Sequence, residues 1–308
     1  MLAHGLATDL TMWDELTEAL KDRYRVLRYD ARGHGGSPAT EGDYSLDMLV
    51  ADAVGILDVL GIAQCHFGGL SMGGMVTLGM LLDHPTRITS AVIADSRHTT
   101  TPDFTAAWHA RAGVRQGGIE AVVASTVRRW SERRSGRTQS GGDHAHGDDD
   151  PRTPRISAIA AAPLHSRGST TAIGSGEIDR PALLICGSED HGAPPENTRQ
   201  MHAAIKGSRF LAIEQAGHIS NIEHPEIFND AVVRFLGDVE RGDRSVRHIM
   251  NGADPAFDRP ADKLSSALKR HRPRRHARRV QKVSILGGAN DHAASAVVPR
   301  ACHRWPPS

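Results

Sequence analysis

Short apolar runs alternate along this chain with segments in which apolar residues recur every three or four positions. An apolar run of four to eight residues bounded by turn residues predicts a buried strand. Leu2 and Ala3 predict a very short first strand. The other segments expected to form strands are 24–30, 64–70, 89–95, 181–187 and 209–215.

Amphipathic helices are predicted between these strands. Residues 12–21, 47–60 and 226–239 place apolar side chains on one helical face, and so does the segment after Gly73. Strands that alternate with helices predict an α/β fold with a mostly parallel sheet covered on both faces. Ligands of such sheets bind beyond the carboxyl ends of the strands.

The pattern fails in two places, which divides the chain into four parts. Residues 1–100 and 177–240 form the predicted core in two pieces, and 101–176 form a cap with a polar insertion, partly disordered. Residues 241–308 form a basic tail without periodicity, which also predicts disorder. Both polar regions could instead be GC-rich coding sequence translated out of frame.

Charge is uneven although the 308-residue chain has a formal net charge of only +1. The tail holds fifteen Lys and Arg against five Asp and Glu, so the remainder is acidic. Residues 269–279 could bind nucleic acid or an anionic membrane, but without interleaved aromatic residues a solvated tail is favoured. We therefore expect no nucleic-acid partner and no membrane partner.

Three cysteines at irregular spacing indicate neither a disulfide framework nor a metal site. Free thiols, with no apolar run long enough to span a bilayer and no signal segment, predict a cytoplasmic protein. The segment 144–150, HAHGDDD, offers metal ligands but no rigid element to set their geometry. The prediction is therefore a protein without a metal or cofactor.

The stretch HFGGLSMGGM contains the pattern G-x-S-x-G centred on Ser71. It follows a predicted strand and precedes a predicted helix, the context in which this pattern forms a nucleophile elbow. Glycines at 69 and 73 allow the sharp turn, and the helix N-terminus presents free backbone N–H groups to a developing oxyanion. A plain glycine-rich turn is the alternative.

A serine nucleophile needs a base and an acid that orients the base. His218 is the favoured base because it follows a predicted strand and therefore reaches the carboxyl edge; His224, before a proline, is the alternative. Asp190 is the favoured acid for the same reason, and Asp95 is the alternative. If Asp190 is the acid, Asp95 and Ser96 could begin the cap and touch the substrate.

The second donor to an oxyanion should come from the loop after an earlier strand. The segment HGL at 4–6 suits this role, with the N–H of Leu6 beside that of Met72. A short N-terminal turn is the alternative. The glycine-rich loop 30–37, DARGHGGS, is interpreted as structural support.

Five segments, HGL, YDARGHGGS, GLSMGG, GSEDHGAPPE and AGHISNIEHPEIF, occur in this order. Together they resemble the α/β-hydrolase superfamily, and within it the 3-oxoadipate enol-lactonases and related serine esterases. Family members begin with more strands and carry a four-helix cap, so the resemblance implies a sheet shortened at the N-terminus and a reduced helical cap.

The resemblance implies a hydrolase with Ser71 as nucleophile, Asp190 as acid and His218 as base, acting on a small-molecule ester or lactone without a cofactor. It also implies a place in aromatic compound catabolism by the β-ketoadipate pathway. In the cap, Trp130 and Arg129 could hold a substrate carboxylate, or could lie on an exposed helix. The alternatives are a carbon–carbon bond hydrolase or perhydrolase on the same triad, and a non-catalytic hydrolase-like binding protein.

Overall fold

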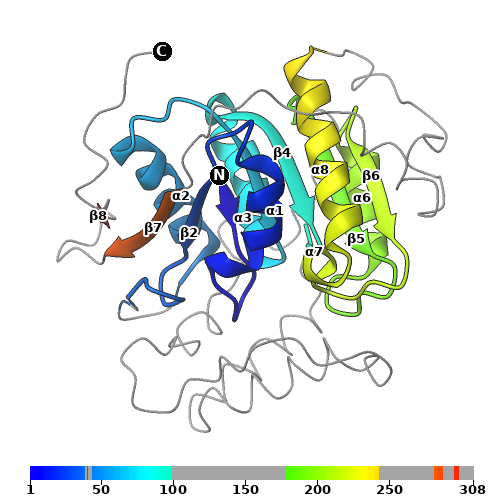
Figure 1. The fold of residues 1–308 in the computed structure, drawn as a ribbon, viewed down its shortest axis with the longest axis horizontal. Coiled ribbons are helices and arrows are strands. Elements are labelled where there is room, and N and C mark those ends of the chain that lie inside the picture. The colour runs from blue at the N-terminus through cyan, green and yellow to red at the C-terminus, as the bar shows by residue number, and fades with distance from the viewer. Residues whose placement is uncertain (39, 41–43, 99–177, 243–280, 287–294, 298–308) are drawn as a thin grey trace, which may run out of the picture.

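A single sheet organises the described part of the chain, which comprises residues 1–38, 40, 44–98, 178–242, 281–286 and 295–297 of this computed structural model. The strand order is β6-β5-β4-β3-β1-β2-β7-β8 (Figure 1). All neighbours are parallel except β7 and β8. The strands are β1 (Leu2–Ala3), β2 (Leu27–Asp30), β3 (Cys65–Leu70), β4 (Ile88–Ala94), β5 (Ala182–Gly187), β6 (Arg209–Ile213), β7 (Gln281–Leu286) and β8 (Ser295–Val297).

Helices cover both faces of this sheet, as Figure 1 shows. They are η1 (Leu10–Trp13), α1 (Asp14–Leu20), α2 (Leu46–Val59), α3 (Met72–Asp83), η2 (Pro85–Arg87), α6 (Pro195–Ala204), α7 (Ser220–Glu223) and α8 (Pro225–Glu240). The predicted parallel sheet with helices on both faces is confirmed.

Two hydrophobic clusters fill the space between the sheet and its helices. One joins α2, α3 and α6 to one face, and the other joins η1, α1 and α8 to the opposite face. Strand β5 shows why the strands are apolar throughout, because Leu184 enters the first cluster while Leu183 and Ile185 enter the second. A parallel strand buried on both faces therefore needs a continuous apolar run.

Strand β2 begins three residues later than the apolar pattern predicts. The run starts at Tyr24, but the strand starts at Leu27. In the neighbouring strand β1, Leu2 is the first residue to pair with β2, and its partner is Arg28. The residues before Arg28 therefore have no pairing partner in β1. The position of this neighbouring strand therefore sets where regular pairing starts.

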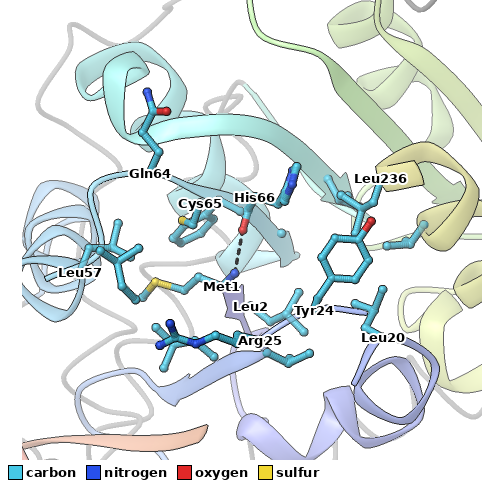
Figure 2. A pocket seen from close by; sticks show the side chains of 17 residues that line it. Met1, Leu2, Leu20, Tyr24, Arg25, Leu57, Gln64, Cys65, His66 and Leu236 are labelled. Carbon is cyan, nitrogen blue, oxygen red and sulfur yellow. Dashed lines mark hydrogen bonds between the residues drawn. The ribbon is translucent and has the colours of Figure 1, made fainter. Parts of the chain in front are cut away.

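The short β1 leaves a cavity of about 260 Å³ at the amino ends of the strands (Figure 2). Leu2 pairs with Gly68, so three residues of β3 extend beyond the start of β1. The α-amino group of Met1 donates a hydrogen bond to the His66 carbonyl oxygen at 2.7 Å, and burial lowers the pKa of this amine. Leu57 lies on one side of the cavity, and Leu20, Tyr24 and Leu236 lie on the other.

The predicted domain boundaries remain predictions, since residues 99–177 lie outside the described part of the chain. Within the predicted tail, the structure has two short strands, and β7 extends the sheet beyond β2. Among the described residues, no helix combines the length and the apolar character that crossing a bilayer requires.

Candidate active site

Ser71 lies in a sharp turn between β3 and α3, at the carboxyl edge of the sheet. Its backbone has φ 56° and ψ −113°, a conformation that non-glycine residues rarely adopt. Two contacts hold the turn: the Ser71 N–H donates to the Ala94 carbonyl at 2.9 Å, and the Ser96 hydroxyl donates to the Ser71 carbonyl at 2.8 Å. Strain of this kind persists where the surroundings over-determine the backbone, and it is concentrated at functional sites.

The glycines on either side of this turn have no room for a side chain. A Cβ at Gly69 would lie 2.0 Å from the Gly73 carbonyl oxygen, and one at Gly73 would lie 2.1 Å from the Ala3 carbonyl oxygen. Helix α3 therefore leaves the turn in direct backbone contact with β1. The G-x-S-x-G spacing predicted from the sequence is a steric requirement of this turn.

The structure brings Ser71, His218 and Asp190 together from three separate loops. His218 Nε2 lies 2.9 Å from Ser71 Oγ, and His218 Nδ1 lies 2.8 Å from Asp190 Oδ2. Because the carboxylate accepts a hydrogen bond from Nδ1–H, Nε2 is left free to accept one from the hydroxyl. This is the arrangement in which an imidazole acts as a base toward a serine.

The Asp190 carboxylate is inaccessible to solvent, whereas the His218 imidazole is partly accessible. The Asp190 side chain has no exposed surface, and that of His218 is 15% exposed. Two backbone N–H groups, those of Gly192 and Ala193, donate to Asp190 Oδ1 at 2.6 and 2.8 Å. These hydrogen bonds fix the direction in which the carboxylate faces the imidazole.

His224 and Asp95, the alternative base and the alternative acid, make no hydrogen bond of the triad. His224 starts α8, where its Nε2 is 3.3 Å from the Gln215 carbonyl oxygen. Asp95 is close to the triad but accepts its hydrogen bonds from Gly187 and Ser220 instead of from an imidazole. Asp95 and Ser96 are buried, and the expectation that they begin the cap and touch the substrate stays a prediction.

The HGL loop lies beside the nucleophile, as predicted. A Cβ at Gly5 would be 3.6 Å from Ser71 Cβ, which places the following residue, Leu6, next to the elbow. Met72 is the first residue of α3, where backbone N–H groups have no partner within the helix. The positions proposed for the two oxyanion donors therefore flank Ser71.

Two buried histidines support this loop, a role that the sequence did not reveal. His4 Nε2 accepts a hydrogen bond from the Ala31 N–H at 2.9 Å, and His34 Nε2 accepts one from the Ala7 N–H at 3.3 Å. Protonation would place a second hydrogen between each donor and its ring. Burial lowers the pKa of His4, and burial together with the nearby His4 lowers that of His34 to about 3. Both rings are therefore neutral.

The loop 30–37 has the structural role that the sequence predicted. Asp30 accepts hydrogen bonds from the backbone N–H groups of Leu10 and Gly36 at 2.8 and 2.9 Å, and its own carbonyl accepts one from the Ser37 hydroxyl. The carboxylate therefore ties the start of η1 to the glycine-rich loop.

A second serine–histidine contact, between Ser90 and His66, lacks the surroundings that the Ser71–His218 contact has. His66 Nδ1 lies 2.8 Å from Ser90 Oγ, between β3 and β4. Within the described ranges this imidazole has no hydrogen bond to a carboxylate, and the pair lies within the strands instead of at their carboxyl ends. Burial lowers the pKa of His66. The Ser90–His66 pair is therefore suited to packing, and Ser90 offers a comparison for Ser71 within the same protein.

The remaining predicted residues fall outside the described part of the chain. Trp130 and Arg129, proposed to bind a carboxylate, lie there, as does the alternative metal segment 144–150. Among the residues described, no three potential ligands gather as a metal site would require. Cys65 and Cys186 are free thiols.

Strand order, elbow and triad together define the class of this protein. The family model for the alpha/beta hydrolase fold matches residues 1–225. The chain belongs to this family and is a hydrolase, which confirms the resemblance and the fold predicted from the sequence.

Similar proteins include lactonases and esterases. The chain is 31% identical to 3-oxoadipate enol-lactonase 1 of Acinetobacter baylyi, over 78% of this chain and 89% of that protein. It is 28% identical to the pimeloyl-[acyl-carrier protein] methyl ester esterase of Aeromonas hydrophila, over 77% and 94%. The crystal structure of the enol-lactonase from Burkholderia xenovorans superposes with a TM-score of 0.61 at 32% identity, over 77% and 90%.

Proposed function

We propose that this hydrolase cleaves an ester or lactone of a small carboxylate-bearing substrate through an acyl-enzyme on Ser71. The observation that carries the proposal is the pair of contacts at His218, 2.9 Å to the Ser71 hydroxyl and 2.8 Å to the Asp190 carboxylate. Similarity to enol-lactonases and to a methyl ester esterase favours carboxylic ester chemistry and makes an enol-lactone like that of 3-oxoadipate the first candidate.

Acylation begins when Ser71 Oγ attacks the carbonyl carbon and His218 Nε2 takes the hydroxyl proton. The carbonyl oxygen becomes an oxyanion, to which the N–H groups of Leu6 and Met72 donate. Asp190 stabilises the imidazolium that forms. The bond between carbonyl carbon and leaving oxygen then breaks, and that oxygen takes the proton from His218. A lactone ring opens at this step, and its leaving oxygen stays attached to the acyl group.

Deacylation repeats these steps with water as the nucleophile. His218 accepts a proton from the water as its oxygen attacks the acyl carbon. The bond to Ser71 Oγ breaks, and Oγ takes the proton back from the imidazolium. The product leaves as a carboxylic acid that ionises in solution. No step requires a metal or cofactor.

We further propose that Trp130 and Arg129 bind the substrate carboxylate, since a guanidinium binds carboxylates with two parallel hydrogen bonds. The free thiols Cys65 and Cys186 favour a reducing compartment, and we place the protein in the cytoplasm. Hydrolysis of an enol-lactone of this type would belong to the catabolism of aromatic compounds.

The test measures turnover of p-nitrophenyl esters, a panel of lactones, vinylogous diketones and peroxide-dependent oxidation. We expect ester and lactone hydrolysis, with kcat falling at least about 10³-fold in Ser71→Ala because the nucleophile is lost. The matched control is Ser90→Ala, which removes the hydroxyl from the other serine–histidine contact and should leave kcat within about threefold of the wild type.

Two results would contradict the proposal. One is a folded, monodisperse wild type that turns over none of these substrates, which would favour a binding role. The other is a Ser71→Ala variant that retains wild-type hydrolysis. Preferential cleavage of the vinylogous diketones would instead favour carbon–carbon bond hydrolysis by the same triad.

A further inference from the structure

Asp95, directly after β4, connects the two loops that carry the acid and the base. Its Oδ1 accepts a hydrogen bond from the Gly187 N–H at 2.9 Å, and its Oδ2 accepts two from Ser220, the N–H at 3.0 Å and the hydroxyl at 2.7 Å. Gly187 precedes Asp190 by three residues, and Ser220 follows His218 by two. One carboxylate therefore joins the end of β5, from which the Asp190 loop starts, to the start of α7, at which the His218 loop ends.

The neighbours of Asp95 hold the third loop. Ala94 accepts the hydrogen bond from the Ser71 N–H, and Ser96 donates its hydroxyl to the Ser71 carbonyl. The backbone of Asp95 has φ 45°, in the left-handed region that aspartate tolerates better than most side chains do. Three consecutive residues thus contact all three loops of the triad.

The charges around this carboxylate come from each loop packed against it. Asp190 carries a negative charge on the loop after β5, His218 becomes positive on the loop after β6, and the Cys186 thiol lies on β5. Burial raises the pKa of Asp95 to about 7, with Asp190 adding to the rise and His218 opposing it. Burial, with Asp95 contributing, raises the pKa of Cys186 to about 12, so the thiol stays protonated.

We propose that Asp95 is a positioning residue whose carboxylate must be ionised for the Asp190 and His218 loops to present the imidazole correctly to Ser71. The inference deepens the proposed function and depends on its nucleophile. An ionised Asp95 satisfies three donors at once. A protonated one keeps fewer acceptor sites and brings a hydrogen of its own, which the Ser220 hydroxyl can accept only by reversing its direction.

The pH dependence of the site separates this role from simple packing. His218 must lose a proton to act as a base, and Asp95 must lose one to hold the loops. Toward low pH, the logarithm of the rate should therefore fall with a slope approaching two per pH unit, whereas a triad that depends on one deprotonation falls with a slope of one. The two groups titrate together, so the slope belongs to the pair.

The experiment follows covalent labelling of Ser71 by phenylmethanesulfonyl fluoride from pH 4.5 to 9, which requires no knowledge of the natural substrate. Ser71 Oγ bonds to sulfur, fluoride leaves, and the hydroxyl proton passes to His218. We expect a slope near two in the wild type. Asp95→Asn should lower the labelling rate at pH 8 by about 10- to 100-fold, since small misplacements of catalytic groups have effects of this size, and should reduce the slope to one.

Two further variants control the result. Ser220→Ala removes one hydrogen bond but keeps the carboxylate, so the slope should remain two with a rate loss under about tenfold. Asp238→Asn makes the same chemical change in an aspartate bonded to Arg209, at the amino end of β6. It should change neither the slope nor the rate. Circular dichroism at each pH confirms that every sample remains folded.

The outcomes distinguish this inference from the function on which it depends. Labelling of Ser71 with a slope of one in the wild type overturns the inference alone, whether or not Asp95→Asn folds. A folded Asp95→Asn variant that labels Ser71 with the rate and the pH slope of the wild type also overturns the inference. Mass spectrometry that finds no adduct on Ser71 overturns the proposed function, and the inference with it.

Discussion

The two ends of the sheet are organised by different interactions. At the carboxyl edge, backbone and side-chain hydrogen bonds fix the loops of Ser71, Asp190 and His218. At the amino ends, β1 is two residues long, and an apolar cavity of about 260 Å³ lies beside it. The difference teaches that directional hydrogen bonds position the loops of the triad, whereas apolar packing shapes the opposite ends of the strands.

The largest effect should come from a methyl group placed where the elbow meets β1. In Gly73→Ala, the new Cβ would lie 2.1 Å from the Ala3 carbonyl oxygen, and neither backbone can move away cheaply. We expect a loss of about 3 kcal/mol in the free energy of unfolding, as for severe overpacking, and loss of Ser71 labelling. Urea denaturation and sulfonyl fluoride labelling measure the two effects.

Gly237→Ala is the matched control for that substitution. In α8 a Cβ would meet only the flexible ends of Arg241 and Arg23, at 3.3 and 3.6 Å. Helix propensity should then raise the free energy of unfolding by about 0.5–1 kcal/mol. A Gly73→Ala variant as stable and reactive as the wild type would show that the contact between elbow and strand is dispensable.

A smaller effect should come from His34, the neutral histidine that accepts a hydrogen bond from the Ala7 N–H directly after the HGL loop. The folded-state pKa of His34 is lowered to about 3, so between that value and its ordinary 6.5 only the unfolded chain binds this proton. The free energy of unfolding therefore falls with decreasing pH, by up to about 1.4 kcal/mol per pH unit for this residue. His34→Gln keeps an acceptor for the Ala7 N–H but cannot be protonated.

Urea denaturation of wild type and His34→Gln at pH 7 and pH 5 checks this expectation. The variant should be less stable at pH 7, because it loses the contact between Nδ1 and the Arg32 carbonyl, and the difference should shrink at pH 5. If His34→Gln lowered the free energy of unfolding by the same amount at pH 7 and at pH 5, His34 would not contribute to the acid sensitivity of the fold.

The smallest effect should be a gain in stability at the amino ends. Val92 is 7% exposed and lines the cavity, so the extra methyl group of Val92→Ile has space to enter. We expect the free energy of unfolding to rise by about 0.8 kcal/mol, with unchanged hydrolysis. Ala91→Val, on the opposite face of β4 and fully buried in the first cluster, should destabilise instead. If Val92→Ile lowered the free energy of unfolding as much as Ala91→Val does, the cavity could not accept a methyl group.

Much of the fold was predictable because its signals are local. The apolar runs located β3 to β6 within two residues at either end, since strands buried on both faces need continuous apolar sequence. The elbow was predictable because only glycine fits at 69 and 73. His218 and Asp190 were found because each follows a strand, and parallel strands bring such residues to one edge.

The contacts that depend on spatial neighbours were not predictable. Asp95 and Asp190 both follow strands, and although the sequence favoured Asp190 as the acid, it did not reveal that Asp95 bonds to Gly187 and Ser220 instead. The neutral form of His34 depends on the Ala7 N–H, 27 residues away. Strand β7 joins β2 across more than 250 residues, and its pairing partner cannot be inferred from its own composition.

The segment Ala94–Ser96 has a consequence for anyone who would change the specificity of this protein. Because these three residues contact every catalytic loop, substitutions there should impair the reaction for all substrates alike. Randomised libraries aimed at new substrates should keep this tripeptide constant and vary positions that leave those hydrogen bonds intact, so that most clones retain a working triad and differ in what they accept.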